Sequence, residues 1–168
     1  MSNAASRPTP PDLQLLQMNN SLGLPLNASL QLADYFDSVI ERCNRDSSGR
    51  PTRLPKHDQI IYYVVSTRCE IDMNGFDSVF DQLLTENELL FLIDALNELG
   101  AAQLASSFDE AHTRLRSAGF FDNDSMMVSD LGLGETGFLD DIERDIRKND
   151  SLWDLDASLV GLIPTDAR

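Results

Sequence analysis

The stretch TENELLFLIDALNELGAAQLASSFDEAHTRLRSAG, residues 85–119, decides the fold. Thr85 and Glu88 have the spacing of a capping box, so a helix is predicted to begin there. Apolar residues then recur at helical spacing until Gly100, a residue suited to the left-handed position that ends a helix. The pattern therefore predicts a helix over 85–99 with one face turned toward the core.

A second amphipathic pattern follows at once, over 101–118, and Gly119 is its expected end. Because the link between the two patterns is so short, the helices are predicted to form an antiparallel hairpin. Their apolar stripes should be buried together, and the predicted set is Leu89, Leu92, Ile93, Leu96, Leu104, Phe108 and Leu115.

Helical spacing is also found on either side of the hairpin. It predicts one helix over 29–44 and another over 138–148, while the polar, glycine-bearing segment 121–137 is expected to be a loop. The last apolar stretch, 152–163, should pack the end of the chain onto the other helices.

The segment 58–71 is ambiguous. Its run Ile60–Val65 has the β-branched and aromatic composition of a strand. The same segment also offers a usable helical face, and Pro55 just upstream suits a helix entry. We predict a helix that ends near Asn74-Gly75, with a strand over Ile60–Val65 as the alternative.

Together these patterns predict an all-α, single-domain helical bundle, in keeping with a length of 168 residues and a hydrophobic fraction of 42%. Residues 1–26 are expected to be a flexible N-terminal tail, in which Ser2-Asn3-Ala4 matches a cloning scar, and residues 27–168 the acidic helical domain. No secretory signal or membrane-length apolar run is found, and the two cysteines are isolated. A reducing cytoplasm is the expected location.

Charge is distributed very unevenly along the chain. Residues 1–68 hold six acids and seven bases, whereas residues 69–168 hold 22 acids and six bases, which gives −16 and accounts for the net charge of −15. No lysine or arginine occurs between Cys69 and Thr113. Such a surface repels nucleic acids and anionic membranes and attracts basic proteins, although a negative balance can also serve solubility alone.

Motifs for cofactors, metals and catalysis are weak. The string 132–137 fits G-x-G-x-x-G, but no strand precedes it and acids surround it, so no dinucleotide is expected. Asp122–Met126 begins like a calcium loop and then lacks the required ligand and glycine. His57 and His112 have no partner at metal or triad spacing. Carboxylate pairs suit acid–base chemistry, yet no pair is distinguished, so we expect no enzyme, no cofactor and no metal.

The acids fall into two kinds according to their neighbours. In 138–148, Asp140 precedes Arg144 and Glu143 precedes Arg147 at the favourable i,i+4 spacing, which predicts a self-paired face. Elsewhere, carboxylates lie one turn apart without a nearby base, at a small electrostatic cost. We select these as candidate contacts for a basic partner: Asp77, Asp81, Glu86, Asp94 and Glu98.

Residues 70–76, Glu-Ile-Asp-Met-Asn-Gly-Phe, with Phe80 one turn on, form the most distinctive motif. With the apolar helix that closes on Gly100-Ala101 and the segment 152–163, the chain resembles the neisserial DNA-mimic protein family over roughly residues 55–163. This chain has one glycine where the family usually has two. The motif residues are Glu70, Asn74, Gly75, Phe76 and Phe80, for which we predict a structural role: Asn-Gly ends a helix and the phenylalanines anchor the next turn.

The resemblance implies an all-helical fold, a homodimer, no cofactor or catalytic residue, and an acidic surface that occupies the DNA-binding face of a transcription regulator. Phe91 gives separate support for a dimer, since it lies off the main apolar stripe. Two hypotheses follow. The protein is either a DNA-mimicking interaction protein or an acidic accessory or immunity-type domain whose charge only confers solubility.

Overall fold

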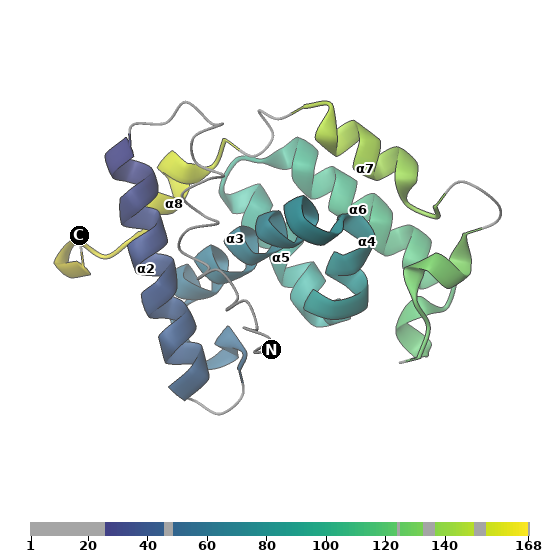
Figure 1. Cartoon of the computed structure of the whole chain (residues 1–168), viewed down its shortest axis with the longest axis horizontal. Coiled ribbons are helices and arrows are strands. Elements are labelled where there is room, and N and C mark those ends of the chain that lie inside the picture. The colour runs from purple at the N-terminus through teal and green to yellow at the C-terminus, as the bar shows by residue number, and fades with distance from the viewer. Residues whose placement is uncertain (1–25, 46–48, 124, 133–136, 150–153, 168) are drawn as a thin grey trace, which may run out of the picture.

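The computed structural model describes residues 26–45, 49–123, 125–132, 137–149 and 154–167, and in this part of the chain all regular structure is helical (Figure 1). The all-α prediction is therefore confirmed. The α-helices are α2 (Leu26–Arg45), α3 (Lys56–Asn74), α4 (Phe76–Ser78), α5 (Glu86–Glu98), α6 (Ala102–Ser117), α7 (Asp140–Arg147) and α8 (Asp156–Leu162). Short helical turns join them: η1 (Pro51–Arg53), the π-helical η2 (Val79–Leu83), η3 (Phe120–Asp122), η4 (Val128–Leu131) and η6 (Thr165–Ala167).

The predicted hairpin is formed by α5 and α6, which pack against each other. Thr85 is the N-cap of α5, and its N–H donates to the Glu88 carboxylate at 2.8 Å, as the capping box predicted. At the other end Gly100 has φ of 82°, and the Ala101 N–H bonds the Leu96 carbonyl at 2.9 Å. This is a Schellman ending, and a left-handed residue is needed there to reverse the chain direction.

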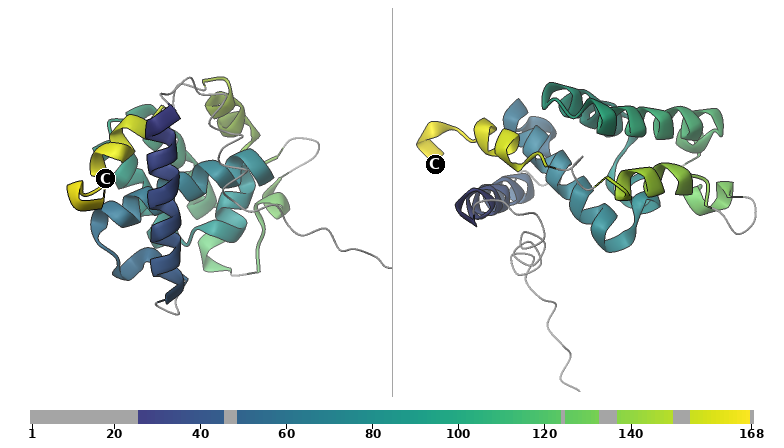
Figure 2. Two further views of the ribbon diagram at one scale, coloured as in Figure 1. Left: turned by 60° about the vertical axis from the view of Figure 1, so that its left-hand side comes forward. Right: turned by 90° about the horizontal axis from the view of Figure 1, so that it is seen from above.

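Helix α3 lies in the middle of the bundle, in contact with α2, α5 and α8 (Figure 2). Its residues are buried around nearly the whole circumference, and they include Ile60, Ile61, Tyr63, Val64, Val65, Thr67 and Ile71. A helix covered on all sides has no single apolar stripe. That is why the run 60–65 resembles a strand in sequence, and the helix prediction over the strand alternative is confirmed.

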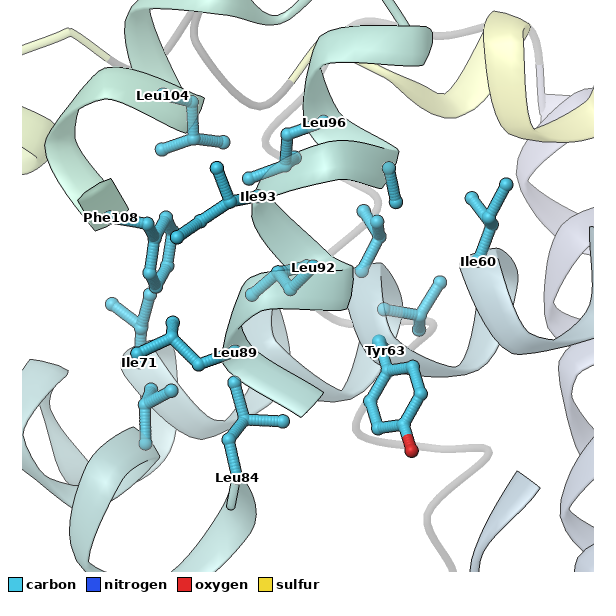
Figure 3. Close-up of a cluster of buried hydrophobic side chains, with 14 of the residues drawn as sticks. Ile60, Tyr63, Ile71, Leu84, Leu89, Leu92, Ile93, Leu96, Leu104 and Phe108 are labelled. Carbon is cyan, nitrogen blue, oxygen red and sulfur yellow. The ribbon is translucent and has the colours of Figure 1, made fainter. Parts of the chain in front are cut away.

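The core shared by α3, α5 and α6 is shown in Figure 3. Every residue of the predicted buried set is indeed buried, and Leu89, Leu92, Leu96, Leu104, Phe108 and Leu115 are each 0% exposed. Leu84, just before α5, closes the lower edge of this cluster. The two long helices are thus held by the residues that their spacing selected.

Some predicted boundaries were inexact. Helix α7 begins at Asp140 rather than 138, and the expected loop 121–137 contains η3 and η4 among its described residues. The end of the chain packs as expected, because α8 lies against α2. Residues 1–25 of the predicted tail, 133–136 of the glycine-bearing string, Asp124 of the calcium-like loop and residues 152–153 fall outside the described residues.

Candidate functional site

The family-like motif builds the turn between α3 and α4. Glu70 accepts hydrogen bonds from Asn74 Nδ2, at 2.9 Å, and from the Ser78 hydroxyl. Gly75 has φ of 93°, a left-handed value that other residues rarely adopt. The single glycine of this chain therefore supplies the positive φ that the turn requires.

The two phenylalanines of the motif anchor that turn in the core. Phe76 is 0% exposed and Phe80 is 5% exposed. Their rings meet edge to face at 5.1 Å between centroids, and Phe76 also lies 5.3 Å from Phe108 of α6. The contacts agree with the structural role that we predicted for Glu70, Asn74, Gly75, Phe76 and Phe80.

Helix α7 is fastened to the same turn through Arg147. Its Nη2 donates to the Ile71 carbonyl at 2.9 Å, and its Nε donates to Glu143 at 2.7 Å. The predicted Glu143–Arg147 pair is therefore present and also caps the C-terminal end of α3, where a positive charge is favourable. Glu143 is thereby placed near the start of α4.

The second predicted pair of α7 is not formed. Within the described residues no ion pair joins Asp140 to Arg144, and Asp140 Oδ2 accepts the Gly137 N–H at 2.7 Å. Asp140 is the first residue of α7, so its carboxylate reaches the backbone preceding the helix. A Cβ built on Gly137 would lie 2.3 Å from Asp140 Oδ1, which accounts for this glycine by packing.

Two of the selected carboxylates already have basic partners within the fold. Glu86 pairs with Arg116, at 3.0 and 2.8 Å, and contacts His112 Nε2 at 2.9 Å, both from α6. Glu98 pairs with Lys56 at the start of α3. The residues next to Glu86 and Glu98 in the sequence did not indicate these pairs, because Arg116 and Lys56 lie 30 and 42 residues away.

Asp94 has a different environment from its two neighbours on α5. Its side chain is exposed, and among the described residues it has no ion pair or hydrogen bond. Asp72 on α3 and Asp109 on α6 are exposed and unpaired in the same sense. We did not select Asp72 and Asp109 from the sequence, because their exposure depends on which face of each helix is covered.

Glu88, the remaining acid of the first turn of α5, is an interior residue. It is 8% exposed and accepts hydrogen bonds from Tyr63 Oη at 2.9 Å and from Thr85 N–H, and it pairs with Arg50 at 3.1 Å. Burial of Tyr63, its hydrogen bond to Glu88 and the Glu88 charge raise the pKa of Tyr63 above its ordinary range. Glu88 therefore fastens the core and contributes nothing to an outer acidic surface.

Asp81 and Asp77 lie on the short α4–η2 segment. Asp81 accepts the Val128 N–H at 2.8 Å and so holds η4 in place. Burial raises the pKa of Asp81, that hydrogen bond lowers it, and nearby Asp130 raises it further. Asp77 is half-buried, and its side chain has no hydrogen bond or ion pair among the described residues.

Asp77 is the most perturbed carboxyl of the described part of the chain. Its pKa is raised to about 6, first by burial and then by repulsion from Glu143, Asp81 and Asp140. We call these four residues the acidic corner. The fold brings them together from η2, α4 and α7, although 59 or more residues separate the two acids of α4–η2 from those of α7 in the sequence.

No group of three or more His, Cys, Asp or Glu in the described residues has a metal-binding arrangement. His57 Nε2 lies 3.4 Å from Asp58 Oδ1, and His112 Nε2 lies 2.9 Å from Glu86 Oε1. No helix in that part of the chain is long and apolar enough to cross a membrane.

Comparison with known families gives one match. A family model described as DMP19-like protein matches residues 52–160, which is more than half of the chain. Searches of curated proteins and of solved structures gave no match. The matched range contains α3 to α7 and hence both the motif turn and the acidic corner.

Proposed function

Because this chain belongs to the DMP19-like protein family, we propose that it is a non-enzymatic interaction protein whose acidic face mimics the charge of DNA. Its partner would be a basic, DNA-binding transcription regulator in a reducing cytoplasm. Neither nucleic acid nor a membrane is an expected partner, since both repel a chain of net charge −15.

The observation that carries the proposal is the acidic corner, where half-buried Asp77 has no basic partner among the described residues. Asp77 is half-buried among three other carboxylates, and its pKa of about 6 reflects the cost of ionising it there. Arg147, which lies on the same helix as Asp140 and Glu143, bonds Glu143 and the Ile71 carbonyl. A cation from a partner would relieve this repulsion, as the lysines and arginines of a DNA-binding surface neutralise phosphates.

The structure also changes which acids are most suitable. Of the five selected from the sequence, Glu86 and Glu98 share their charge with Arg116 and Lys56. Asp77, Asp81 and Asp94 retain charge that no base of the described residues neutralises. We therefore place the main contact at the acidic corner, with Asp94 contributing long-range attraction.

A charge-matched pair of variants tests this placement. Asp77→Asn with Asp81→Asn removes two charges from the acidic corner, and asparagine at 81 can still accept the Val128 N–H. Glu86→Gln with Glu98→Gln removes two charges that are already paired. The native partner, captured from the source cell at low salt and identified by its release with duplex DNA, would be titrated against both variants.

We expect the first variant to bind about tenfold more weakly and the second about as well as the native chain. Binding should also weaken steeply between 0.1 and 1 M salt, where the Debye length falls from about 10 Å to about 3 Å. Equal losses in both variants, or binding that survives molar salt, would instead support an accessory domain whose charge confers solubility.

We further propose that the protein forms a homodimer through the outer face of α5. Leu90 is 42% exposed there, and a second chain packed on this face would remove its apolar side chain from water. Phe91, which suggested a dimer from sequence, lies against Tyr63 at 5.5 Å between ring centroids and is partly covered. Sedimentation equilibrium should give a dimer that Leu90→Glu converts to a monomer, and a monomeric native chain at tens of micromolar would refute this.

A further inference from the structure

A pocket of about 500 Å³ is formed by elements that lie at the opposite end of the molecule from α4 and α7, where Figure 1 shows α2 and α8. It is bounded by α2, by the first turn of α3 and by the segment after α8. Its lining residues are Tyr35, Ser38, Arg42, His57, Pro164 and Ala167. None of these is acidic.

A buried carboxylate lies behind this lining and fixes the arginine. Asp58 is 0% exposed and accepts the Tyr35 hydroxyl at 2.7 Å. The Arg42 guanidinium contacts both Asp58 oxygens, with Nη2 3.2 Å from Oδ1 and Nη1 3.0 Å from Oδ2. Arg42 Nε also donates to the Ser38 carbonyl at 3.2 Å.

This arrangement leaves Arg42 N–H groups that do not bond Asp58. A guanidinium has five N–H donors, and the hydrogen bonds to Asp58 Oδ1 and to the Ser38 carbonyl use two of them. The Arg42 side chain is 35% exposed and that of His57 is 33% exposed, so both are accessible from the pocket. His57 meets Asp58 through Nε2 at 3.4 Å, which leaves its other ring nitrogen available.

We propose that this pocket binds a small oxyanion, the carboxylate or phosphate group of a low-molecular-weight ligand. The guanidinium N–H groups that do not bond Asp58 or Ser38 are charged donors for such a group, and the orientation of the side chain is already fixed by a buried aspartate. Fixing the side chain beforehand reduces the entropy that binding must remove. The Tyr35 and Ser38 hydroxyl oxygens stand beside the fork and can accept hydrogen bonds from a ligand hydroxyl.

Arg42 already has a structural role, which is to neutralise Asp58. The experiment must therefore detect ligand binding itself and not the loss of this ion pair. The experiment is an amide NMR titration of the full chain with inorganic phosphate and, separately, with succinate. Sodium chloride at the same ionic strength provides the reference. Saturable shifts around Ser38, His57 and Ala167 that chloride does not reproduce are expected, and the stronger of the two anions identifies the preferred group.

Three variants make the assignment specific. Ser38→Phe fills the pocket without changing a charge and should abolish the saturable shifts. Arg42→Lys keeps a cation beside Asp58 but removes the fork, and binding should weaken about tenfold or more. Ser107→Phe is the matched control, because the Ser107 hydroxyl on α6 donates to the Gln103 carbonyl at 3.3 Å, as the Ser38 hydroxyl donates to the Tyr35 carbonyl at 2.6 Å. Anion binding by this control should be unchanged.

Several results would overturn the proposal. These are the absence of saturable shifts with either anion, equal shifts with chloride, or binding that persists when the pocket is filled. If the spectrum shows that Ser38→Phe does not fold, Ala167→Trp fills the pocket from its other wall and replaces it. Binding that survives in that variant would equally exclude the site.

Discussion

The α5–α6 hairpin and the acidic corner are both rich in carboxylates, yet their charges are handled in opposite ways. In the hairpin, packing two antiparallel helices brings Arg116 and His112 to Glu86. In the acidic corner, the attachment of α7 to the end of α3 through Arg147 brings Glu143 and Asp140 toward Asp77. The comparison shows that the number of acids in a segment does not determine the electrostatic field at its surface. The field depends on which side chains the tertiary fold places opposite them.

The largest expected effect concerns the core that holds the hairpin together. Leu96 is 0% exposed between α3 and α6, and Leu96→Ala should lower the free energy of unfolding by about 2–5 kcal/mol. Met73→Ala, at a residue of α3 that is 55% exposed and lies outside the proposed dimer face, is the control and should change it little. Urea denaturation measures both. Similar losses in the two variants would contradict the packing described for α5.

The next effect should be a gain in stability at the acidic corner. The folded-state pKa of Asp77 is about 6, above its ordinary value of 3.8, so folding is favoured by its neutral form. Its contribution is fully present below about pH 4 and is lost as the pH rises through about 6. Asp77→Asn should therefore stabilise the fold at pH 7.5 by about 1–2 kcal/mol, after allowance for solvent screening.

The pH dependence of that gain makes the test specific. The difference in unfolding free energy between Asp77→Asn and the native chain should shrink as the pH falls from 7.5 to 4. Other carboxylates titrate in the same range, so only this difference is informative. A variant that is less stable than the native chain at pH 7.5 would show that Asp77 has a favourable partner.

A smaller effect of opposite sign is expected in the hairpin. Glu86→Gln removes the ion pair with Arg116, whose side chain is 55% exposed, and should cost up to about 1 kcal/mol at pH 7.5. Thermal unfolding at low and high salt measures it, and the loss should diminish with salt. Stabilisation by this change would mean that the two regions do not differ as described.

The smallest effect on the isolated protein is expected at Asp94. Because it is exposed and unpaired in the described structure, Asp94→Lys should leave the unfolding free energy unchanged. Under the proposed function it should slow association with the basic partner at low salt, and stopped-flow mixing measures that rate. An unchanged rate would confine the binding surface to the acidic corner.

Local patterns predicted the helices well because their signals lie within a few residues. The capping box at Thr85, the glycine at Gly100 and the apolar stripe between them fixed α5 almost to the residue. The run 60–65 was ambiguous because other helices pack around α3. A helix that is buried on every side shows no amphipathic pattern in its sequence. The Asn74-Gly75 turn and its two phenylalanines were likewise recognisable from sequence.

The candidate site was less predictable because ion pairs between helices have no local signature. Lys56 reaches Glu98 across 42 residues, so Glu98 seemed unanswered in the sequence. The acidic corner was equally hidden, since Asp140 and Glu143 were assigned to a self-paired face. Their proximity to Asp77 follows from the contact of Arg147 with the end of α3.

Helix α2 and Arg50 have a consequence for any attempt to shorten the protein. The family match begins at residue 52, after both of them. Yet Arg50 bonds the Leu83 carbonyl at 2.6 Å and pairs with Glu88, and Arg42 of α2 pairs with Asp58. A fragment cut at the matched boundary would leave two interior carboxylates without their arginines. Because these arginines are 35% and 37% exposed, the cost is about 1–3 kcal/mol for each pair, below that of a fully buried pair. An expression fragment that folds must therefore start upstream of Leu26, the first residue of α2.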